Sequence, residues 1–255
     1  MTAPNNSSAP SLKRVEPRAA PDAPKRPARN ADSRGSGAKE RFERIYLKIR
    51  SRICQLEYAP GTRLSEEALA REFTVSRTPI RSVLSRLEGE GLVQSRHGVG
   101  TFVTDVDYAA LAEVYRLRLE LAALIGKLKP RQPNARDLKK IETIARKCAM
   151  IPEAKAPKRE FSRINIDFFE SLVAMTANQP MQDVLRRLFY QSARIWMTAM
   201  PEQEVNRESK IFHREINEII DAVKDGCLKK VGKLRRKHIS EGLGRLLMYV
   251  GEPSD

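Results

Sequence analysis

The stretch from residue 75 to residue 103, VSRTPIRSVLSRLEGEGLVQSRHGVGTFV, combines hydroxyl, guanidinium and glycine residues in a pattern suited to binding a polyanion. Ser76 and Thr78 place hydroxyl donors at the start of a predicted helix, where free backbone amides attract the same phosphate oxygens. Arg77 and Arg81 stand four residues apart, on one helical face. A guanidinium can donate two hydrogen bonds to O6 and N7 of guanine. These residues therefore predict contact with double-stranded DNA.

The residues that follow predict a second DNA contact. Arg96 and His97 are cationic or polar side chains before Gly98 and Gly100, which permit a tight turn. Such a tip can approach the minor groove or its phosphates. Pro79 fits the first turn of the preceding helix, because its missing N–H has no helical partner there.

The elements that must position these side chains are short and contiguous. Apolar residues recur at helical spacing from Phe42 to Leu56, and a second short helix is expected from an N-cap at Ser65 to Phe73, with Ala68 and Leu69 inward. The third helix runs from Arg77 to about Gly89, and residues 92–103 read as strand, turn and strand. This order predicts a winged helix-turn-helix over residues 41–106. The alternative is that Ser-Arg-Thr-Pro only caps a surface helix.

The remainder of the chain carries helical patterns without further strands. Six helices are predicted, with breaks at prolines or at Gly226: 107–129, 135–150, 158–177, 180–200, 203–224 and 227–249. Residues 1–40 are proline-rich, basic and without apolar period, which predicts a disordered basic tail, and residues 250–255 form a second tail. The fold class is therefore mainly α: an N-terminal winged helix-turn-helix followed by an all-helical bundle at 107–249.

Composition narrows the function. Lys and Arg total 47 against 32 acids, for a net charge of +15, which favours a polyanionic partner. Three widely spaced cysteines and the absence of a long apolar run predict a reduced, cytoplasmic protein with no membrane contact. With three histidines and no nucleophile–base or phosphate-loop motif, the sequence gives no indication of an enzyme.

The segments LEYAPGTRLSEEALAREFTVSRTPIRSVLSRLEGEGLV and HGVGTFV resemble the winged helix of the GntR family of bacterial transcription regulators. The resemblance implies a homodimer on a short palindromic operator in double-stranded DNA. It places Arg77, Thr78, Arg81, His97 and Gly98 at the family's DNA-contact positions.

Residues 107–249, beginning DYAALAEVYRLRLELAALIG, resemble the helical effector domain of the FadR-like branch, called FCD. Many such domains hold a divalent metal through one Asp and three His. The resemblance puts Asn165, Phe169, Ile216 and His238 at those four positions, and His213 lies one turn before Ile216. Because one imidazole does not retain zinc, no metal and no other cofactor is expected.

Without a metal, an anionic effector needs a cationic side chain. Arg118 and Arg194 are candidates because guanidinium binds carboxylate bidentately, although both would also suit surface ion pairs. Asn165 and His238 complete the expected effector site, and His238 would equally suit a satisfied core position. The predicted function is a transcription regulator, a repressor, controlled by a small metabolite such as an organic acid. The alternative is a constitutive DNA-binding protein with an inert dimerisation bundle.

Overall fold

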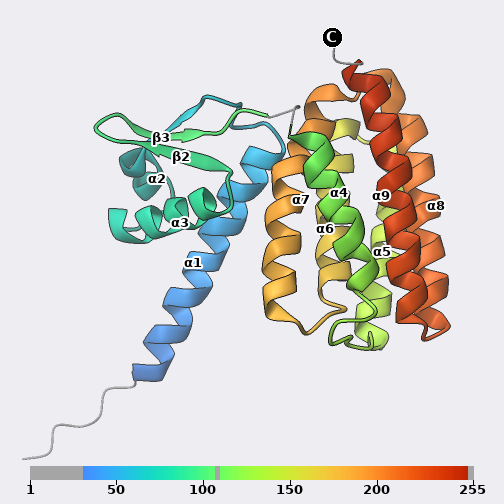
Figure 1. Ribbon diagram of the computed structural model, residues 1–255. Helices are drawn as coiled ribbons and strands as arrows, with labels where there is room; N and C mark the ends of the chain where they lie inside the picture. The colour runs from blue at the N-terminus through green and yellow to red at the C-terminus, as the bar shows by residue number, and fades with distance from the viewer. Residues whose placement is uncertain (1–30, 107–109, 252–255) are drawn as a thin grey trace, which may run out of the picture. The chain divides into compact units, whose positions relative to one another are not determined.

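The computed structural model describes residues 31–106 and 110–251, with side chains from residue 37 onward (Figure 1). The chain divides into two compact units, and the boundary between them lies after Ala38. The tails predicted at 1–40 and 250–255 fall largely outside the described residues. Where they overlap, the backbone is helical: helix α1 spans Ala31–Cys54, and the last helix reaches Val250. Residues 31–40 therefore belong to a helix rather than to a disordered tail.

The winged helix has the predicted order of elements with one additional strand. It consists of α1, β1 (Arg63–Leu64), α2 (Glu66–Glu72), α3 (Arg77–Gly89), β2 (Val93–Arg96) and β3 (Gly100–Val103). The sheet order is β1-β3-β2, with both pairs antiparallel. The two-residue strand β1 is too short to show an alternating pattern, so periodicity did not predict it. In α2, Leu69 is buried as predicted, whereas Ala68 is exposed and Ala70 faces the core.

Six helices follow, close to their predicted positions. Their bounds are α4 Leu111–Leu124, α5 Ala135–Ala149, α6 Pro157–Val173, α7 Gln179–Ala199, α8 Val205–Lys224 and α9 Leu228–Val250. Single 3₁₀ turns at Ile151–Glu153 and Glu202–Glu204 join α5 to α6 and α7 to α8. Asn134 begins α5 with a reciprocal capping box to Asp137, and Asn178 caps α7 by accepting from Met181 N–H.

Two glycines bring α4 and α9 into close contact. A β-carbon at Gly126 would stand 2.0 Å from the carbonyl oxygen of Leu228, and one at Gly232 would stand 2.9 Å from that of Ala123. Neither position can therefore carry a side chain without moving the facing backbone. The two helices lie side by side in Figure 1. This contact places Arg118, one turn before Ala122, near the part of α9 that follows Gly232.

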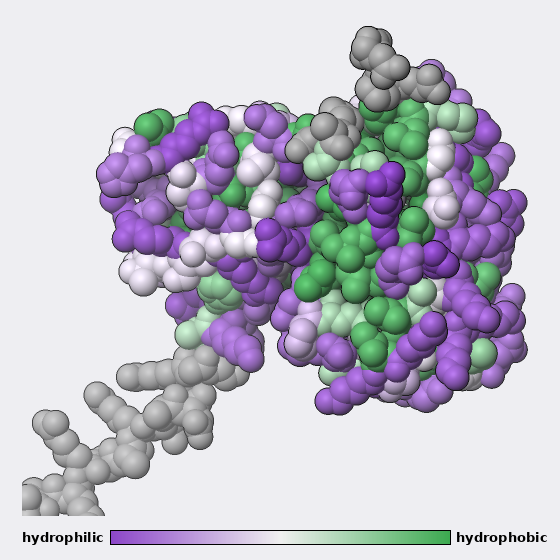
Figure 2. Space-filling view, in the orientation of Figure 1, coloured by the Kyte–Doolittle hydropathy of each residue, from purple (hydrophilic) through white to green (hydrophobic). Residues whose placement is uncertain are grey.

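Apolar side chains also remain on the surface of α4. Leu117, Leu121 and Leu124 of α4 and Leu128 just beyond it recur at helical spacing. Leu117 and Leu128 are 47% and 40% exposed, whereas Leu121 and Leu124 are half-buried against the core. Figure 2 shows apolar side chains gathered over α4 on the face in view. Within residues 31–106 and 110–251, every helix is too short or too polar to span a lipid bilayer.

Candidate functional site

The amino end of α3 presents the predicted DNA-contact residues to solvent. The helix begins after the N-cap Ser76, whose hydroxyl makes no capping hydrogen bond. Its apolar row is buried: Ile80, Val83, Leu84 and Leu87. The helical period therefore turns Arg77, Thr78 and Arg81 outward, while Pro79 is half-buried in the first turn. The exposed hydroxyls and the first backbone amides of α3 can together bind phosphate oxygens.

Two glutamates of α2 bind the arginines of α3. The Arg81 guanidinium donates to both carboxylate oxygens of Glu66, over 3.1 Å from Nε and 2.9 Å from Nη2. This hydrogen bonding lowers the pKa of Glu66. Arg77 Nη2 lies 3.1 Å from Glu67 Oε2. The arginine side chains are 62% and 72% exposed, so the pairs are screened by water and a phosphate or guanine edge can replace them.

The wing carries the second group of predicted residues. Arg96 ends β2 opposite Gly100 of β3, and the turn between them exposes His97 and Gly98. Gly98 and Gly100 have φ angles of 70° and 135°, which side chains rarely permit. The Arg96 guanidinium lies 4.8 Å from the ring centroid of Phe102 and stays exposed. The wing tip is therefore narrow and cationic, as a minor-groove or phosphate contact requires.

A cavity of about 60 Å³ in the helical bundle is lined by residues of α4, α6, α7, α8 and α9. It brings together three of the four predicted effector residues: Arg118, Asn165 and His238. Arg194 is elsewhere, because its guanidinium donates to the carbonyl oxygen and hydroxyl of Thr104 at 2.7 and 2.9 Å. Arg194 lines a second cavity of about 260 Å³, so the predicted four residues do not form one site.

Two guanidiniums in the first cavity are buried without carboxylate partners. Arg118 is 7% exposed and donates to Ser192 Oγ at 2.8 Å, with the rings of Tyr115 and Phe189 nearby. Arg235 is also 7% exposed, and among the described residues it forms neither a hydrogen bond nor an ion pair. Burial lowers the pKa of Arg235 to about 10. Neither guanidinium forms an ion pair with a described carboxylate, although the charge of Glu215 acts on Arg235 from farther away.

The acidic residues of the same cavity already have a partner. Arg245 Nε lies 3.0 Å from Glu208 Oε2, and its Nη2 lies 3.3 Å from Glu215 Oε1. Tyr249 OH donates to Glu208 Oε1 at 2.9 Å. Burial raises the pKa of Glu215. Glu208 and Glu215 therefore offset Arg245 and, through the charge of Glu215, part of Arg235, so the three cavity arginines exceed the two carboxylates by one positive charge.

His238 is 2% exposed and lines the cavity. Its Nε2 lies 2.9 Å from Glu218 Oε2, whereas its Nδ1 is buried without a hydrogen-bond partner. Burial lowers the pKa of this imidazole, which favours the neutral form. With the proton on Nε2, shared with Glu218, Nδ1 is an acceptor that needs a donor from inside the cavity.

The four positions where related domains hold a metal do not fit one here. Phe169 stacks on Phe189, Ile216 is fully buried in the core, and Asn165 offers one amide oxygen. Among the described residues no group of three or more His, Cys, Asp or Glu is arranged to hold a metal ion. The donor set is therefore a single imidazole and a weak oxygen, which does not hold a divalent ion.

Sequence reasoning missed Arg235, Arg245, Glu208 and Glu215. The helical period could have identified Arg235, because it places this residue on the same buried face of α9 as Val231 and His238. A charged residue on an apolar face needs an anion. Glu208 and Glu215 stand seven residues apart on α8, but only the folded structure shows that Arg245 bridges them.

An exposed, arginine-bearing helix α3 with a cationic wing, followed by an all-helical domain, defines the class of winged helix-turn-helix proteins with a helical C-terminal domain. Residues 41–103 match the model of bacterial regulatory proteins of the gntR family, and residues 113–241 match the FCD domain. The chain therefore belongs to the FCD-containing gntR family. It is a DNA-binding transcription regulator and not an enzyme.

Individual relatives agree with this assignment. An HTH-type transcriptional regulator of Streptomyces ambofaciens is 49% identical over 82 residues, 31% of this chain and 35% of that protein. The gluconate operon transcriptional repressor of Bacillus subtilis is 28% identical over 148 residues, 57% of this chain and 59% of the relative. Both alignments thus span less than two thirds of the relative. The fold of E. coli McbR/YncC is similar at a TM-score of 0.69 and 15% identity, covering 83% of this chain and 99% of that one.

Proposed function

We propose that this regulator represses transcription as a cytoplasmic homodimer on a palindromic operator until a small anionic metabolite enters the bundle cavity. The main support for control by a metabolite is the pair of buried guanidiniums of Arg118 and Arg235. They lack carboxylate partners and share a cavity with the unpartnered Nδ1 of His238.

An anion in the cavity would remove an energetic cost of the free protein. A buried charge without a counter-ion is unfavourable by several kcal/mol even after relaxation of its surroundings. A carboxylate can accept two charge-assisted hydrogen bonds from each guanidinium. Its binding energy would therefore include relief of the cost that Arg118 and Arg235 impose.

The size and polarity of the cavity limit the size and chemical class of the metabolite that can bind. About 60 Å³ holds roughly four or five water molecules at about 10–15 Å³ each, so the unliganded cavity suits a carboxylate of few atoms. Nδ1 of His238 accepts rather than donates, which favours a hydroxyl group beside the carboxylate. We propose a small hydroxy acid as the chemical class.

The DNA side of the proposal rests on α3 and the wing. Arg77 and Arg81 would read base edges, whereas Ser76, Thr78 and the wing would bind the backbone. A dimer is supported by the apolar row along α4, because Leu117 and Leu128 are exposed beside the half-buried Leu121 and Leu124, and a second copy would cover them. Two related half-sites then follow from the two-fold symmetry.

The test of metabolite control is calorimetric titration of the full chain with sodium acetate, glycolate and lactate, with sodium chloride as the reference salt. Binding of a hydroxy acid should be lost in Arg118→Met and kept in Arg236→Met, whose side chain is exposed and pairs with Glu120. Bound hydroxy acid should also weaken binding to DNA that the protein selects from a random pool. Binding of none of these acids, with DNA affinity intact, would instead support the constitutive regulator with an inert bundle.

A further inference from the structure

Arg50 of α1 is a buried arginine with contacts in both the winged helix and the bundle. It is 6% exposed, and its Nη1 donates to Tyr46 OH over 2.9 Å. Its Nη2 lies 3.6 Å from Glu170 Oε1 of α6, and its Cζ lies 3.8 Å from the ring centroid of Tyr190 of α7. One planar side chain therefore makes an ion pair, a hydrogen bond and a cation–π contact.

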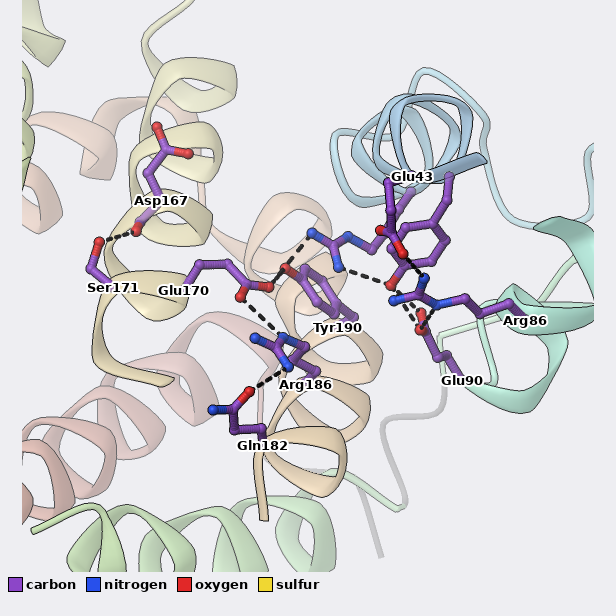
Figure 3. Close-up of polar contacts among 11 residues, drawn as sticks. Glu43, Arg86, Glu90, Asp167, Glu170, Ser171, Gln182, Arg186 and Tyr190 are labelled. Atoms are coloured by element: carbon purple, nitrogen blue, oxygen red, sulfur yellow. Dashed lines mark hydrogen bonds and ion pairs between the residues drawn. The ribbon is translucent and has the colours of Figure 1, made fainter. Parts of the chain in front are cut away.

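From Arg50 the contacts continue to α3. Tyr46 OH donates to Glu90 Oε1 at 2.7 Å, and Glu90 is the C-cap of α3. The Cζ atom of Arg86 in α3 lies 3.7 Å from the centroid of the Tyr46 ring, and its Nη1 lies 2.6 Å from Glu43 Oε1. Figure 3 shows Glu43, Arg86 and Glu90 gathered on this side. The carboxyl-terminal end of α3 is thus tied to α1 beside Arg50.

In the other direction the contacts reach the bundle cavity. Glu170 accepts from Tyr190 OH at 2.5 Å and from Arg186 Nε at 3.1 Å (Figure 3). Its neighbour Phe169 stacks on Phe189 with ring centroids 3.8 Å apart and planes 4° from parallel. Phe189 lines the cavity, where its ring centroid lies 5.5 Å from the Arg118 guanidinium. The interval between cavity and Arg50 is therefore filled by packed aromatic rings.

We propose that Arg50 couples occupancy of the bundle cavity to the position of α3, through Glu170 and Tyr190 on one side and Tyr46 on the other. This inference rests on the proposed control by a metabolite and names its route. A ligand bound by Arg118 alters the contacts of Phe189, and a close-packed ring stack transmits a small displacement instead of absorbing it. Arg50 has to follow Glu170 and Tyr190 together, because the guanidinium binds both.

Coupling between two sites is reciprocal, so the inference can be tested without knowing the metabolite. The chain has one tryptophan, Trp196, which lines the cavity and donates to Tyr115 OH at 2.9 Å. The probe is a labelled DNA duplex that the wild-type chain selects from a random pool. Anisotropy of the label measures DNA binding, and emission of Trp196 measures the response of the cavity in the same sample.

We expect saturating duplex to change Trp196 emission in the wild-type chain. In Arg50→Lys, which keeps the charge and loses the planar fork, that change should fall by more than half while the duplex still binds. Tyr190→Phe keeps the ring and loses the hydroxyl bound to Glu170, and it should also reduce the change. Arg52→Lys is the matched control on the same helix, since Arg52 binds Glu72 and Tyr58 within the winged helix.

A full emission change in both Arg50→Lys and Tyr190→Phe would overturn the inference, because the two residues would then be only structural. An unchanged wild-type emission with the duplex bound would overturn it as well. Failure of the wild-type chain to select any duplex would instead contradict the proposed operator binding, and anisotropy alone detects that outcome.

Discussion

The arginines of α3 and those of the bundle cavity have the same chemistry in opposite surroundings. Arg77 and Arg81 are mostly exposed and paired with glutamates of α2. Arg118 and Arg235 are 7% exposed and have no carboxylate partner among the described residues. Water screens the first pair, so their glutamates can be exchanged for DNA at small cost. The second pair is unscreened, so a single small anion changes its energy strongly.

The difference indicates how each region selects its ligand. The exposed arginines need many simultaneous contacts, because each is weak in water, and only an extended polyanion provides them. The buried arginines need one partner of the right size. In the proposed function, the same residue type would therefore bind DNA in one domain and a metabolite in the other, and burial would decide between the two.

The largest effect is expected on DNA binding. Arg77→Ala and Arg81→Ala should each weaken binding to the selected duplex by about 10- to 100-fold and leave thermal unfolding unchanged. Fluorescence anisotropy and scanning calorimetry measure the two quantities. Arg187→Ala, an exposed arginine of α7, is the control. Equal weakening on unrelated DNA would show that the two arginines bind phosphates instead of bases.

Replacement of a cavity arginine should instead stabilise the free protein. Arg235→Met removes an unpaired buried charge and keeps most of its volume, so urea unfolding of the free protein should show a gain of about 1–3 kcal/mol. Arg236→Met should stay within about 0.5 kcal/mol, because that side chain is exposed. A clear loss of stability in Arg235→Met would show that the guanidinium is compensated in the free protein, and the comparison would fail.

The pH dependence of folding stability should test whether His238 is neutral in the cavity of the folded protein. Burial lowers the folded-state pKa of His238, whereas the unfolded side chain titrates near about 6.5. The unfolded chain therefore binds the proton first as the pH falls below this value, and the wild type loses up to about 1.4 kcal/mol per pH unit there. The His238→Gln protein should lose less stability over the same pH range, because glutamine does not bind a proton there. Comparing the two proteins at each pH cancels the contribution of Glu215, whose raised pKa acts in the opposite direction.

The smallest effect concerns the glutamates of α2. Glu66→Gln removes the charged partner of Arg81, so binding to the selected duplex should strengthen by about two- to fivefold at low salt. Glu113→Gln, which pairs with Arg116 on α4, should leave the affinity unchanged. Weaker binding in Glu66→Gln would mean that the carboxylate orients the guanidinium for base contact, so that the pair acts as a unit.

The winged helix was predictable because its determinants are local. One helical period places Ile80, Val83 and Leu84 inward and leaves Arg77 and Arg81 outside, whatever the helix packs against. The turn chemistry of Gly98 and Gly100 is equally local. The same reasoning located the six bundle helices, since prolines and N-caps mark their ends. It failed for β1, whose two residues depend on pairing with β3.

The cavity depended on contacts between helices. Periodicity puts Arg118 and Arg235 on the inner faces of α4 and α9, but only the close packing at Gly126 and Gly232 determines that they share one space. Arg194 shows the same limit, because its binding to Thr104 separates it from the other predicted residues. The sequence by itself determined the apolar rows that turn inward, such as Ile80, Val83 and Leu84, since these follow from a period within one helix. The tertiary structure decided which buried charges meet, because the partner of each charge lies far away in the chain.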